Sequence, residues 1–175
     1  MLTHETAREA IDLFFDAYRR YTCTETKMFP ELSPGDLSQE AYRSLEQELG
    51  VPLPWSFKEW HRRFHARGLQ VQGTYLPLSP VDEPLQDLKD RILALDHLTE
   101  AIPLGVVPFG FDEITQSVVA FDTRSPADDD EWPVLFLKRG KGTGFDAAVI
   151  EHTSFPDLLE GLTRVIDGTM DPEEP

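Results

Sequence analysis

Apolar residues recur at three- and four-residue spacing in five stretches of the chain, a pattern typical of helices that bury one face. In the first stretch, Ile11, Phe14 and Tyr18 fall on this face. The spacing, the prolines and the capping residues predict helices over Thr3–Tyr21, from Ser38 or Asp36 to Leu49, over Pro54–Arg67, over Pro84–Leu98 and from Ser154 to Asp167. For the last of these, Ser154 and Asp157 resemble a capping box.

Shorter runs rich in β-branched and aromatic residues occupy much of the remaining chain. Their expected bounds are Leu69–Leu76, Ile102–Phe109, Ser117–Thr123, Val134–Lys138 and Ala147–His152. Turn-sized links join the later runs, and the helices mostly precede or follow them. We therefore expect an α+β fold with a largely antiparallel central sheet flanked by helices.

The chain has 175 residues, which is enough for one hydrophobic core. We expect an N-terminal helix and loop (1–37) packed on a single domain (38–167), followed by a flexible tail (168–175). The one cysteine excludes a disulfide framework within the chain and the multi-cysteine zinc signatures. Because no secretory signal and no bilayer-length apolar segment is visible, we expect a soluble, cytoplasmic protein.

Negative charge is concentrated in the second part of the chain. The net charge is −16, with 9 Lys/Arg against 11 Asp/Glu in residues 1–75 and 7 against 21 in residues 76–175. An acidic surface repels phosphate backbones and attracts basic proteins, so we expect a protein partner with a basic surface and no direct nucleic-acid binding. The alternative is that the charge serves solubility alone.

One helix end lies directly before another helix start between Leu45 and Trp60. Gly50 can adopt the left-handed conformation that closes a helix, and Pro52 prevents the helix from continuing. Pro54 suits a first helical turn, where its missing N–H costs nothing. Two aromatic residues, Phe57 and Trp60, then follow at helical spacing.

This segment is the first of three that share their order with a known family. It reads Leu45-x3-Leu49-Gly50-x2-Leu53-Pro54-x2-Phe57-Lys58-x-Trp60. The second reads Val107-Pro108-Phe109-Gly110-Phe111-Asp112, followed by Phe121-Asp122, and the third reads Ser154-Phe155-x2-Leu158-Leu159. They resemble the L-G-x-x-L-P turn, the I-P-F-A-x-D segment with its later F-D pair, and the closing S-F-x-x-F-L helix of the SUKH superfamily of Smi/Knr-like domains. The resemblance covers Ser38 to Asp167, although Glu113-Ile114-Thr115-Gln116 stands where the family has a glycine-rich turn.

The resemblance implies a binding function without catalysis. SUKH domains in bacteria are mostly immunity proteins that bind and neutralise toxins, many of which are nucleases, and the acidic charge would suit a basic toxin. The family also includes regulatory scaffolds, so the alternative is an intracellular module of the same fold that binds a host protein. No cofactor is implied.

Acidic residues near the strand ends are the candidate contacts for such a partner, because exposed carboxylates pair with Lys and Arg. Trp132 is included since aromatic residues beside charges are common at interfaces. The candidates are Asp112, Glu113, Asp122, Asp128, Asp129, Asp130, Glu131 and Trp132. A contiguous acidic run lacks the alternating spacing of a calcium loop, and the alternative is a solvated loop without a function.

Catalytic or metal chemistry is a third hypothesis. His61 and His65 are four residues apart on the third helix, but Arg62 and Arg63 follow the first histidine where a zincin has glutamate, so we expect a solvated basic face rather than a metal site. The glycines at 140–144 lack the register of a phosphate loop. We therefore predict no enzyme activity and no metal.

Overall fold

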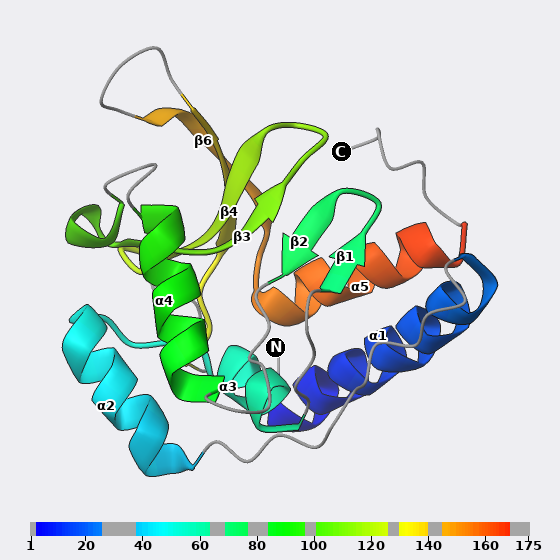
Figure 1. Cartoon of the computed structure of the whole chain (residues 1–175), viewed down its shortest axis with the longest axis horizontal. Helices are drawn as coiled ribbons and strands as arrows, with labels where there is room; N and C mark the ends of the chain where they lie inside the picture. The colour runs from blue at the N-terminus through cyan, green and yellow to red at the C-terminus, as the bar shows by residue number, and fades with distance from the viewer. Residues whose placement is uncertain are drawn as a thin grey trace.

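The computed structural model describes residues 3–25, 38–63, 69–76, 84–96, 101–125, 130–139 and 145–168. Its helices are α1 (His4–Glu25), α2 (Gln39–Leu49), α3 (Trp55–Arg63), α4 (Pro84–Asp96), the short 3₁₀ helix η1 (Ile102–Leu104) and α5 (Phe155–Ile166). Its strands are β1 (Leu69–Val71), β2 (Thr74–Leu76), β3 (Val106–Asp112), β4 (Ser117–Asp122), β5 (Val134–Arg139) and β6 (Phe145–His152) (Figure 1). This arrangement confirms the predicted α+β class.

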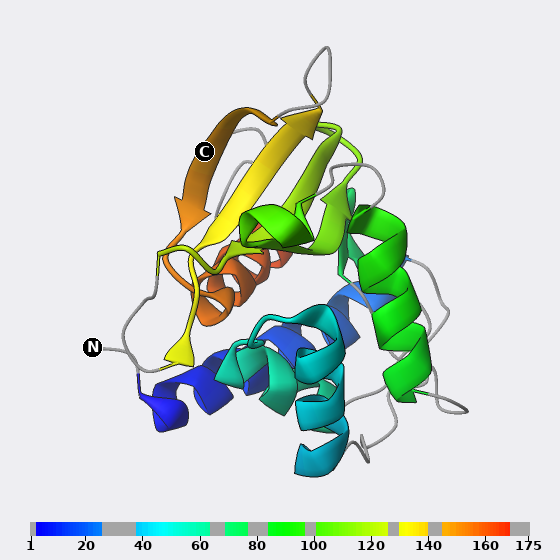
Figure 2. The same ribbon diagram turned by 90° about the vertical axis from the view of Figure 1, so that its left-hand side faces the viewer.

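The described strands form one sheet in the order β1-β2-β3-β4-β5-β6, and each pairs antiparallel with the next. Every strand therefore lies beside its neighbour in sequence, and α4 and η1 lie in the link between β2 and β3. Figure 2 shows α5 against one face of this sheet, with α1, α2 and α3 beyond it on the same side. The predicted antiparallel sheet flanked by helices is confirmed.

Two predicted strands differ from the structure by more than one or two end residues. Leu69–Leu76 is a hairpin rather than one strand, because Gln72 and Gly73 both have positive φ (43° and 97°) and reverse the chain between β1 and β2. Two central residues with positive φ are what a type I′ turn requires. The run from Ile102 begins as η1, and Gly105 at φ 78° ends it before β3 starts.

The predicted helix caps are confirmed where the structure describes them. Ser38 accepts a hydrogen bond from the Ala41 N–H at 3.2 Å at the start of α2, and Gly50 closes this helix at φ 71°. Ser154 accepts from the Asp157 N–H at 3.3 Å at the start of α5. These side chains satisfy N–H groups that the helices themselves leave without an acceptor. The residues predicted to continue α3, 64–67, lie outside the described residues.

Aromatic side chains from all three family-like segments meet in the core. Phe109 of β3 stacks on Phe121 of β4 at a centroid distance of 3.9 Å. Phe57 of α3 contacts Phe121 edge-on at 5.2 Å and Phe155 of α5 at 5.4 Å. Trp60 contacts Phe155 at 5.5 Å, and all five rings are fully buried. The segments therefore share one packing function despite their separation in sequence.

Helix α1 belongs to the same core. Phe14 and Phe15 are buried and contact the Trp60 ring at 5.2 and 4.5 Å. Ile11 and Tyr18 join the same buried cluster on the face that the spacing predicts. The N-terminal helix thus packs on the sheet domain through aromatic contacts, and α5 lies beside it (Figure 1).

Replacing Gly110 with alanine should destabilise the fold. A Cβ at this position of β3 would lie 2.6 Å from the backbone oxygen of Tyr75 on β2, so the paired strands would have to separate. We expect the free energy of unfolding to fall by about 1–3 kcal/mol, as for other overpacked sites. Urea unfolding followed by tryptophan fluorescence measures this change.

Gly50→Asn is the matched control. A Cβ at Gly50 meets nothing within 4 Å, and asparagine tolerates the left-handed conformation better than most residues. The control should therefore cost less than Gly110→Ala. Equal losses in the two variants would contradict steric crowding at Gly110.

Candidate functional site: a charged cleft beside the acidic loop

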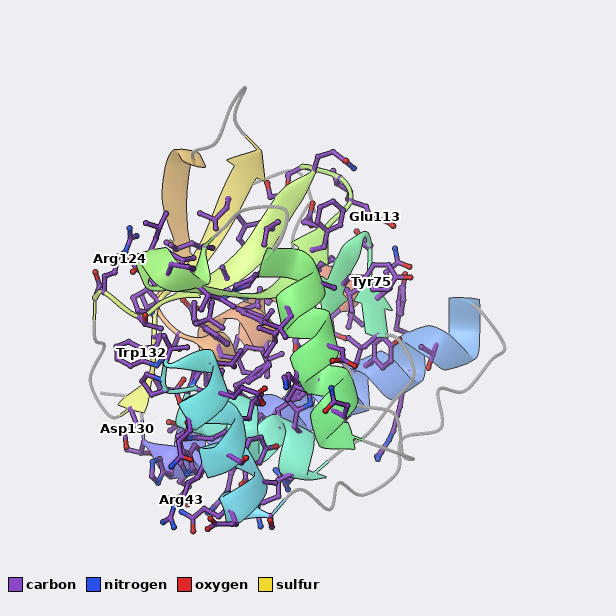
Figure 3. All side chains as sticks on the ribbon, turned by 60° about the vertical axis from the view of Figure 1, so that its left-hand side comes forward. Arg43, Tyr75, Glu113, Arg124, Asp130 and Trp132 are labelled. Carbon is purple, nitrogen blue, oxygen red and sulfur yellow. The ribbon has the colours of Figure 1, made fainter. Side chains whose placement is uncertain are left out.

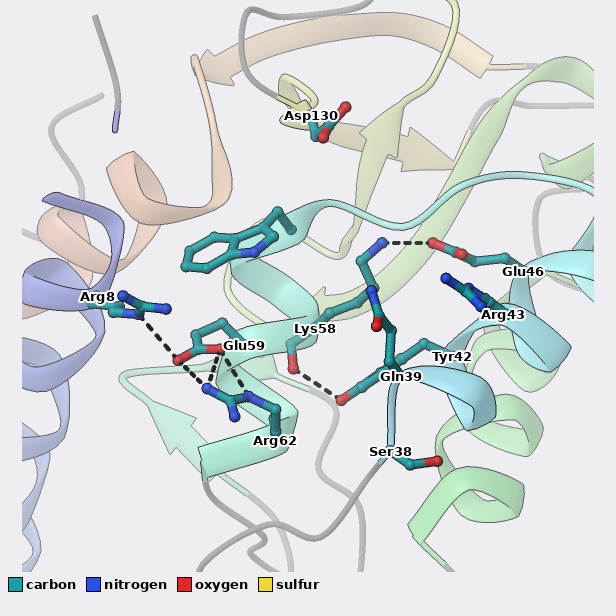
Figure 4. Close-up of a pocket in the computed structure, with 11 residues that line it drawn as sticks. Arg8, Ser38, Gln39, Tyr42, Arg43, Glu46, Lys58, Glu59, Arg62 and Asp130 are labelled. Carbon is teal, nitrogen blue, oxygen red and sulfur yellow. Dashed lines mark hydrogen bonds and ion pairs between the residues drawn. The ribbon is translucent and has the colours of Figure 1, made fainter. Parts of the chain in front are cut away.

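A cleft of ≈ 790 Å³ opens between helices α1, α2 and α3, next to Asp130 in the connection between β4 and β5 (Figure 4). Its walls are mostly charged or aromatic. The lining residues are Arg8, Ser38, Gln39, Tyr42, Arg43, Glu46, Trp55, Lys58, Glu59, Arg62 and Asp130. Most of them belong to α2, α3 and the first turns of α1, so the cleft depends on how these helices are held.

The turn between α2 and α3 fixes the two helices against each other. Glu46 of α2 accepts hydrogen bonds from the Leu53 N–H and from Lys58 Nζ, both at 2.9 Å. The Tyr42 hydroxyl donates to the Lys58 carbonyl at 2.9 Å. Burial raises the pKa of Tyr42, which keeps this hydroxyl protonated and able to donate. The Leu-Gly-x-x-Leu-Pro segment therefore joins the two helices, α2 and α3, whose residues line most of the cleft.

Two arginines share one buried carboxylate at the other wall. Glu59 is 6% exposed. It accepts two hydrogen bonds from Arg62, Nε at 2.9 Å and Nη2 at 2.8 Å, and a third from Arg8 Nε at 3.4 Å. Paired hydrogen bonds of this kind fix the orientation of a guanidinium. Arg8 and Arg62 are about half exposed, so their remaining N–H groups face outward.

Trp55 extends this cluster with an aromatic surface. Its ring stacks on His4 of α1 at a centroid distance of 3.9 Å and an interplanar angle of 9°. The Arg8 guanidinium lies 5.3 Å from the ring centroid, within the range of a cation–π contact. These contacts also join the start of α1 to the start of α3.

The cleft is electrically unlike the rest of the chain. Its lining carries four cationic side chains (Arg8, Arg43, Lys58 and Arg62) and three carboxylates (Glu46, Glu59 and Asp130). The lining is therefore net positive by one charge in a chain whose net charge is −16. An anionic group meets less repulsion here than on a surface of average charge.

Glu131, one of the predicted partner contacts, is buried instead of exposed. It is 2% exposed, and its carboxylate accepts from the Ser56 N–H at 2.8 Å and the Ser56 hydroxyl at 2.6 Å. Ser56 is in the first turn of α3, so Glu131 satisfies a free N–H of this helix. Glu131 therefore links the connection between β4 and β5 to α3.

Asp112 and Asp122 are also buried and bonded within the chain. Asp112 accepts from the Thr115 N–H at 2.7 Å and the Thr74 hydroxyl at 2.8 Å, which ties the β3–β4 turn to β2. Asp122 accepts from Arg124 Nε at 2.7 Å, and this hydrogen bond lowers the pKa of Asp122. Both carboxylates hold turns, and the sequence pattern alone does not reveal those partners.

The exposed candidates do not form a single patch. Figure 3 shows Glu113 near the β3–β4 turn, well away from Asp130 and Trp132. Glu113 accepts from Gln70 at 3.1 Å, Asp130 is exposed at the cleft, and Trp132 is half-buried against the core. Asp128 and Asp129 lie outside the described residues. Asp130 is therefore the predicted contact that the structure brings to the cleft.

The expectation of a solvated histidine face is wrong for His61. This residue is fully buried, and its ring contacts Phe57 edge-on at 4.5 Å. It lies toward the core because α3 is covered on more than its Phe57–Trp60 face. His65 lies outside the described residues. Within the described part of the chain, no group of three or more His, Cys, Asp or Glu side chains could hold a metal ion.

The basic residues of α3 also have carboxylate neighbours that the sequence analysis did not identify. Lys58 pairs with Glu46, Arg62 with Glu59, and Arg63 with Asp12 of α1 at 2.8 Å. These partners come from three different helices. Only the i,i+3 pair Glu59–Arg62 has a signal in the local sequence.

A membrane span is a separate question. No helix among the described residues combines the length and the apolar character needed to cross a bilayer.

The stability of the chain should depend on pH through Glu131. Burial raises the pKa of Glu131 from 4.5 to about 7, although the hydrogen bonds from Ser56 and the charge of Lys58 act in the opposite direction. Between these values the native carboxyl keeps a proton that the unfolded carboxyl releases. The stabilisation is complete below pH 4.5 and is lost as the pH rises through about 7.

Glu131→Gln isolates this effect, because glutamine keeps the hydrogen-bonding oxygen and cannot ionise. From pH 5 to pH 8, we expect the unfolding free energy of the wild type to fall by about 1–3 kcal/mol relative to this variant. Urea unfolding at the two pH values measures the difference. Burial also lowers the pKa of His152. Both proteins contain this histidine, so its effect on the unfolding free energy cancels in the comparison. Parallel pH profiles would rule out a raised pKa at Glu131.

Comparison with known protein families matches residues 36–161 to the SMI1 / KNR4 family (SUKH-1). The matched range contains both walls of the cleft except Arg8, and it contains the five core aromatic residues from α3, β3, β4 and α5. A search of curated proteins found no match. Since the family match spans more than half of the chain and agrees with the α+β fold, this protein belongs to the SMI1 / KNR4 family (SUKH-1).

Proposed function

We propose that this protein is an immunity protein that binds a cognate toxin stoichiometrically and neutralises it. Membership of the SMI1 / KNR4 family (SUKH-1) carries the proposal, since domains of this family often act as immunity proteins. The action is binding rather than catalysis, and the site of action is the cytoplasm.

The roles of the carboxylates support a binding function. Glu46, Glu59 and Glu131 each accept hydrogen bonds that hold a helix or a neighbouring cation in place. A general acid or base has to be free to exchange its proton with a substrate. Carboxylates engaged in this way are better suited to keeping a surface rigid, and a rigid surface loses less entropy on binding.

The charge of the chain supports a partner with a basic surface. The net charge of −16 speeds the approach of a cationic protein, most strongly at low ionic strength. Asp130 remains exposed beside the cleft, and Glu113 remains exposed at the β3–β4 turn. We propose Asp128–Asp130, Glu113 and Trp132 as contacts with the toxin, whereas the burial of Asp112, Asp122 and Glu131 makes them supports of that surface.

Co-expression with an adjacent toxin gene tests the proposal. Cells that express the toxin with this protein should grow, and cells that express the toxin alone should not. The two proteins should also co-purify as a complex of fixed stoichiometry. Undiminished toxicity together with no complex would contradict an immunity function, and a stable complex with a non-toxic host protein would favour a regulatory module.

Neutralising Asp128–Asp130 should slow association with the toxin. With all three changed to asparagine, we expect the association rate at low salt to fall by about threefold to tenfold and to depend less on ionic strength. Stopped-flow fluorescence at several salt concentrations measures both quantities. Asparagine tolerates the positive φ of 60° at Asp130, so the backbone conformation at this residue is preserved.

The matched control changes three exposed aspartates elsewhere, Asp16, Asp90 and Asp167, to asparagine. It alters the net charge by the same amount and should slow association less, because these residues lie on α1, on α4 and after α5. If the two triple variants slow association equally, only the total charge steers the toxin and the loop has no special role.

A further inference from the structure

The cleft between α1, α2 and α3 is better suited to a protein segment than to a small molecule. Seven of its eleven lining residues are charged, whereas small-molecule pockets are lined mainly by apolar side chains. Five of the eleven are Arg, Tyr or Trp, the residue types that carry most binding energy at protein interfaces. These five are Arg8, Tyr42, Arg43, Trp55 and Arg62.

Two cationic groups of the cleft, Arg8 and Arg62, are held in place before any partner arrives. Glu59 orients Arg62 through Nε and Nη2, and it holds Arg8 through Nε. Within the described residues, no hydrogen bond is formed by Nη1 of Arg62 or by either terminal nitrogen of Arg8. A guanidinium has five N–H donors, so both side chains keep donors for an incoming acceptor. Two cations around one buried anion leave a net positive charge.

Arg43 supplies a further cation across the cleft. It is 63% exposed, and its ion pair with Glu40 is long, 3.6 Å, with a carboxylate that is 85% exposed. Such a pair contributes little and exchanges easily with solvent. The Arg43 guanidinium can therefore turn to a partner without losing a strong interaction. Figure 4 shows it on the opposite wall from the Arg8–Glu59–Arg62 group.

We infer that this cleft is the docking site for a carboxylate-bearing segment of the toxin, with Arg8, Arg62 and Arg43 pairing with its Asp or Glu side chains and Trp55 providing an apolar contact. The inference rests on the proposed immunity function and adds the location and local charge of the contact. A nucleic acid fits less well, because a long polyanion would also meet the strongly acidic remainder of the chain.

Charge reversal at Arg43 tests the inference with a close control. Arg43→Glu and Arg19→Glu change the net charge equally, and both residues are exposed helix arginines with an i,i+3 carboxylate, at 3.6 and 3.4 Å. Arg19 does not line the cleft. With the product of the adjacent toxin gene as the probe in isothermal titration calorimetry, Arg43→Glu should weaken binding about tenfold relative to Arg19→Glu.

A second variant covers the opposite wall. This triple variant changes Arg8, Glu59 and Arg62 to glutamine. Because the carboxylate is removed together with both cations, no buried charge is left without a partner. We expect about a tenfold loss of affinity here too, with circular dichroism confirming that the variant is folded. If neither this variant nor Arg43→Glu differs from Arg19→Glu by more than about twofold, the cleft is not the docking site.

The remaining outcomes are also decisive. Tighter binding by Arg43→Glu would mean that the cleft receives a basic segment, which overturns the inference. Binding of a labelled 20-nucleotide single-stranded DNA that Arg43→Glu abolishes would overturn it in favour of a nucleic-acid site. If the wild type does not bind the toxin at all, the proposed function fails, whereas wild-type binding that is insensitive to both cleft variants refutes the docking site alone.

Discussion

The contact between Phe57 and the stacked pair Phe109–Phe121 is the interaction on which the other parts of the structure depend. It joins the first helix after the Leu-Pro turn to the two central strands, and Phe155 closes the group from α5. Aromatic rings in edge-to-face and offset contacts gain more than their buried area alone provides. Because α3 is held by its buried side, its other side is free to present the charged residues of the cleft. The packing of the core thus sets the position of the site.

The close approach of β2 to β3 accounts for a difference between this chain and the family pattern. The I-P-F-A-x-D segment has alanine where this chain has Gly110, and the Tyr75 carbonyl lies 2.6 Å from where a Cβ would be. Strands β2 and β3 therefore approach more closely at this point than an alanine permits. The β3–β4 register shifts between Pro108 and Gly110, so the strand is irregular beside the stacked Phe109. The glycine allows the edge hairpin β1–β2 to pair beside the aromatic core.

The sequence predicted those features that depend on near neighbours. The helix caps at Ser38 and Ser154 follow from residues three positions away, and the buried helix faces follow from spacing. The β1–β2 hairpin was missed because Gln72-Gly73 lacks the asparagine or aspartate typical of such turns. The cleft was missed for another reason. Arg8 and Glu59 are 51 residues apart, and Ser56 and Glu131 are 75 apart, so no local pattern links them.

The acidic run at 128–131 illustrates how one charge pattern can hide two physical roles. Asp130 is exposed at the cleft, whereas Glu131, the next residue, is buried against the first turn of α3. Asp130 has a positive φ, so the chain turns locally at the point where the side chains of Asp130 and Glu131 take different directions.

This arrangement reconciles an acidic protein with a cationic cleft. Charge interactions at a distance are screened beyond about 10 Å, so approach depends on the summed charge while contact depends on the groups that meet. A basic toxin would be attracted by the negative charge of the whole chain. At contact, the toxin segment that we propose for the cleft has to satisfy the guanidiniums that Glu59 orients, because a buried cation without an acceptor is costly. A partner with the right total charge and no carboxylate at that point would approach quickly and dissociate quickly. On this proposal, the long-range and short-range charges of the protein select for two separate properties of its partner.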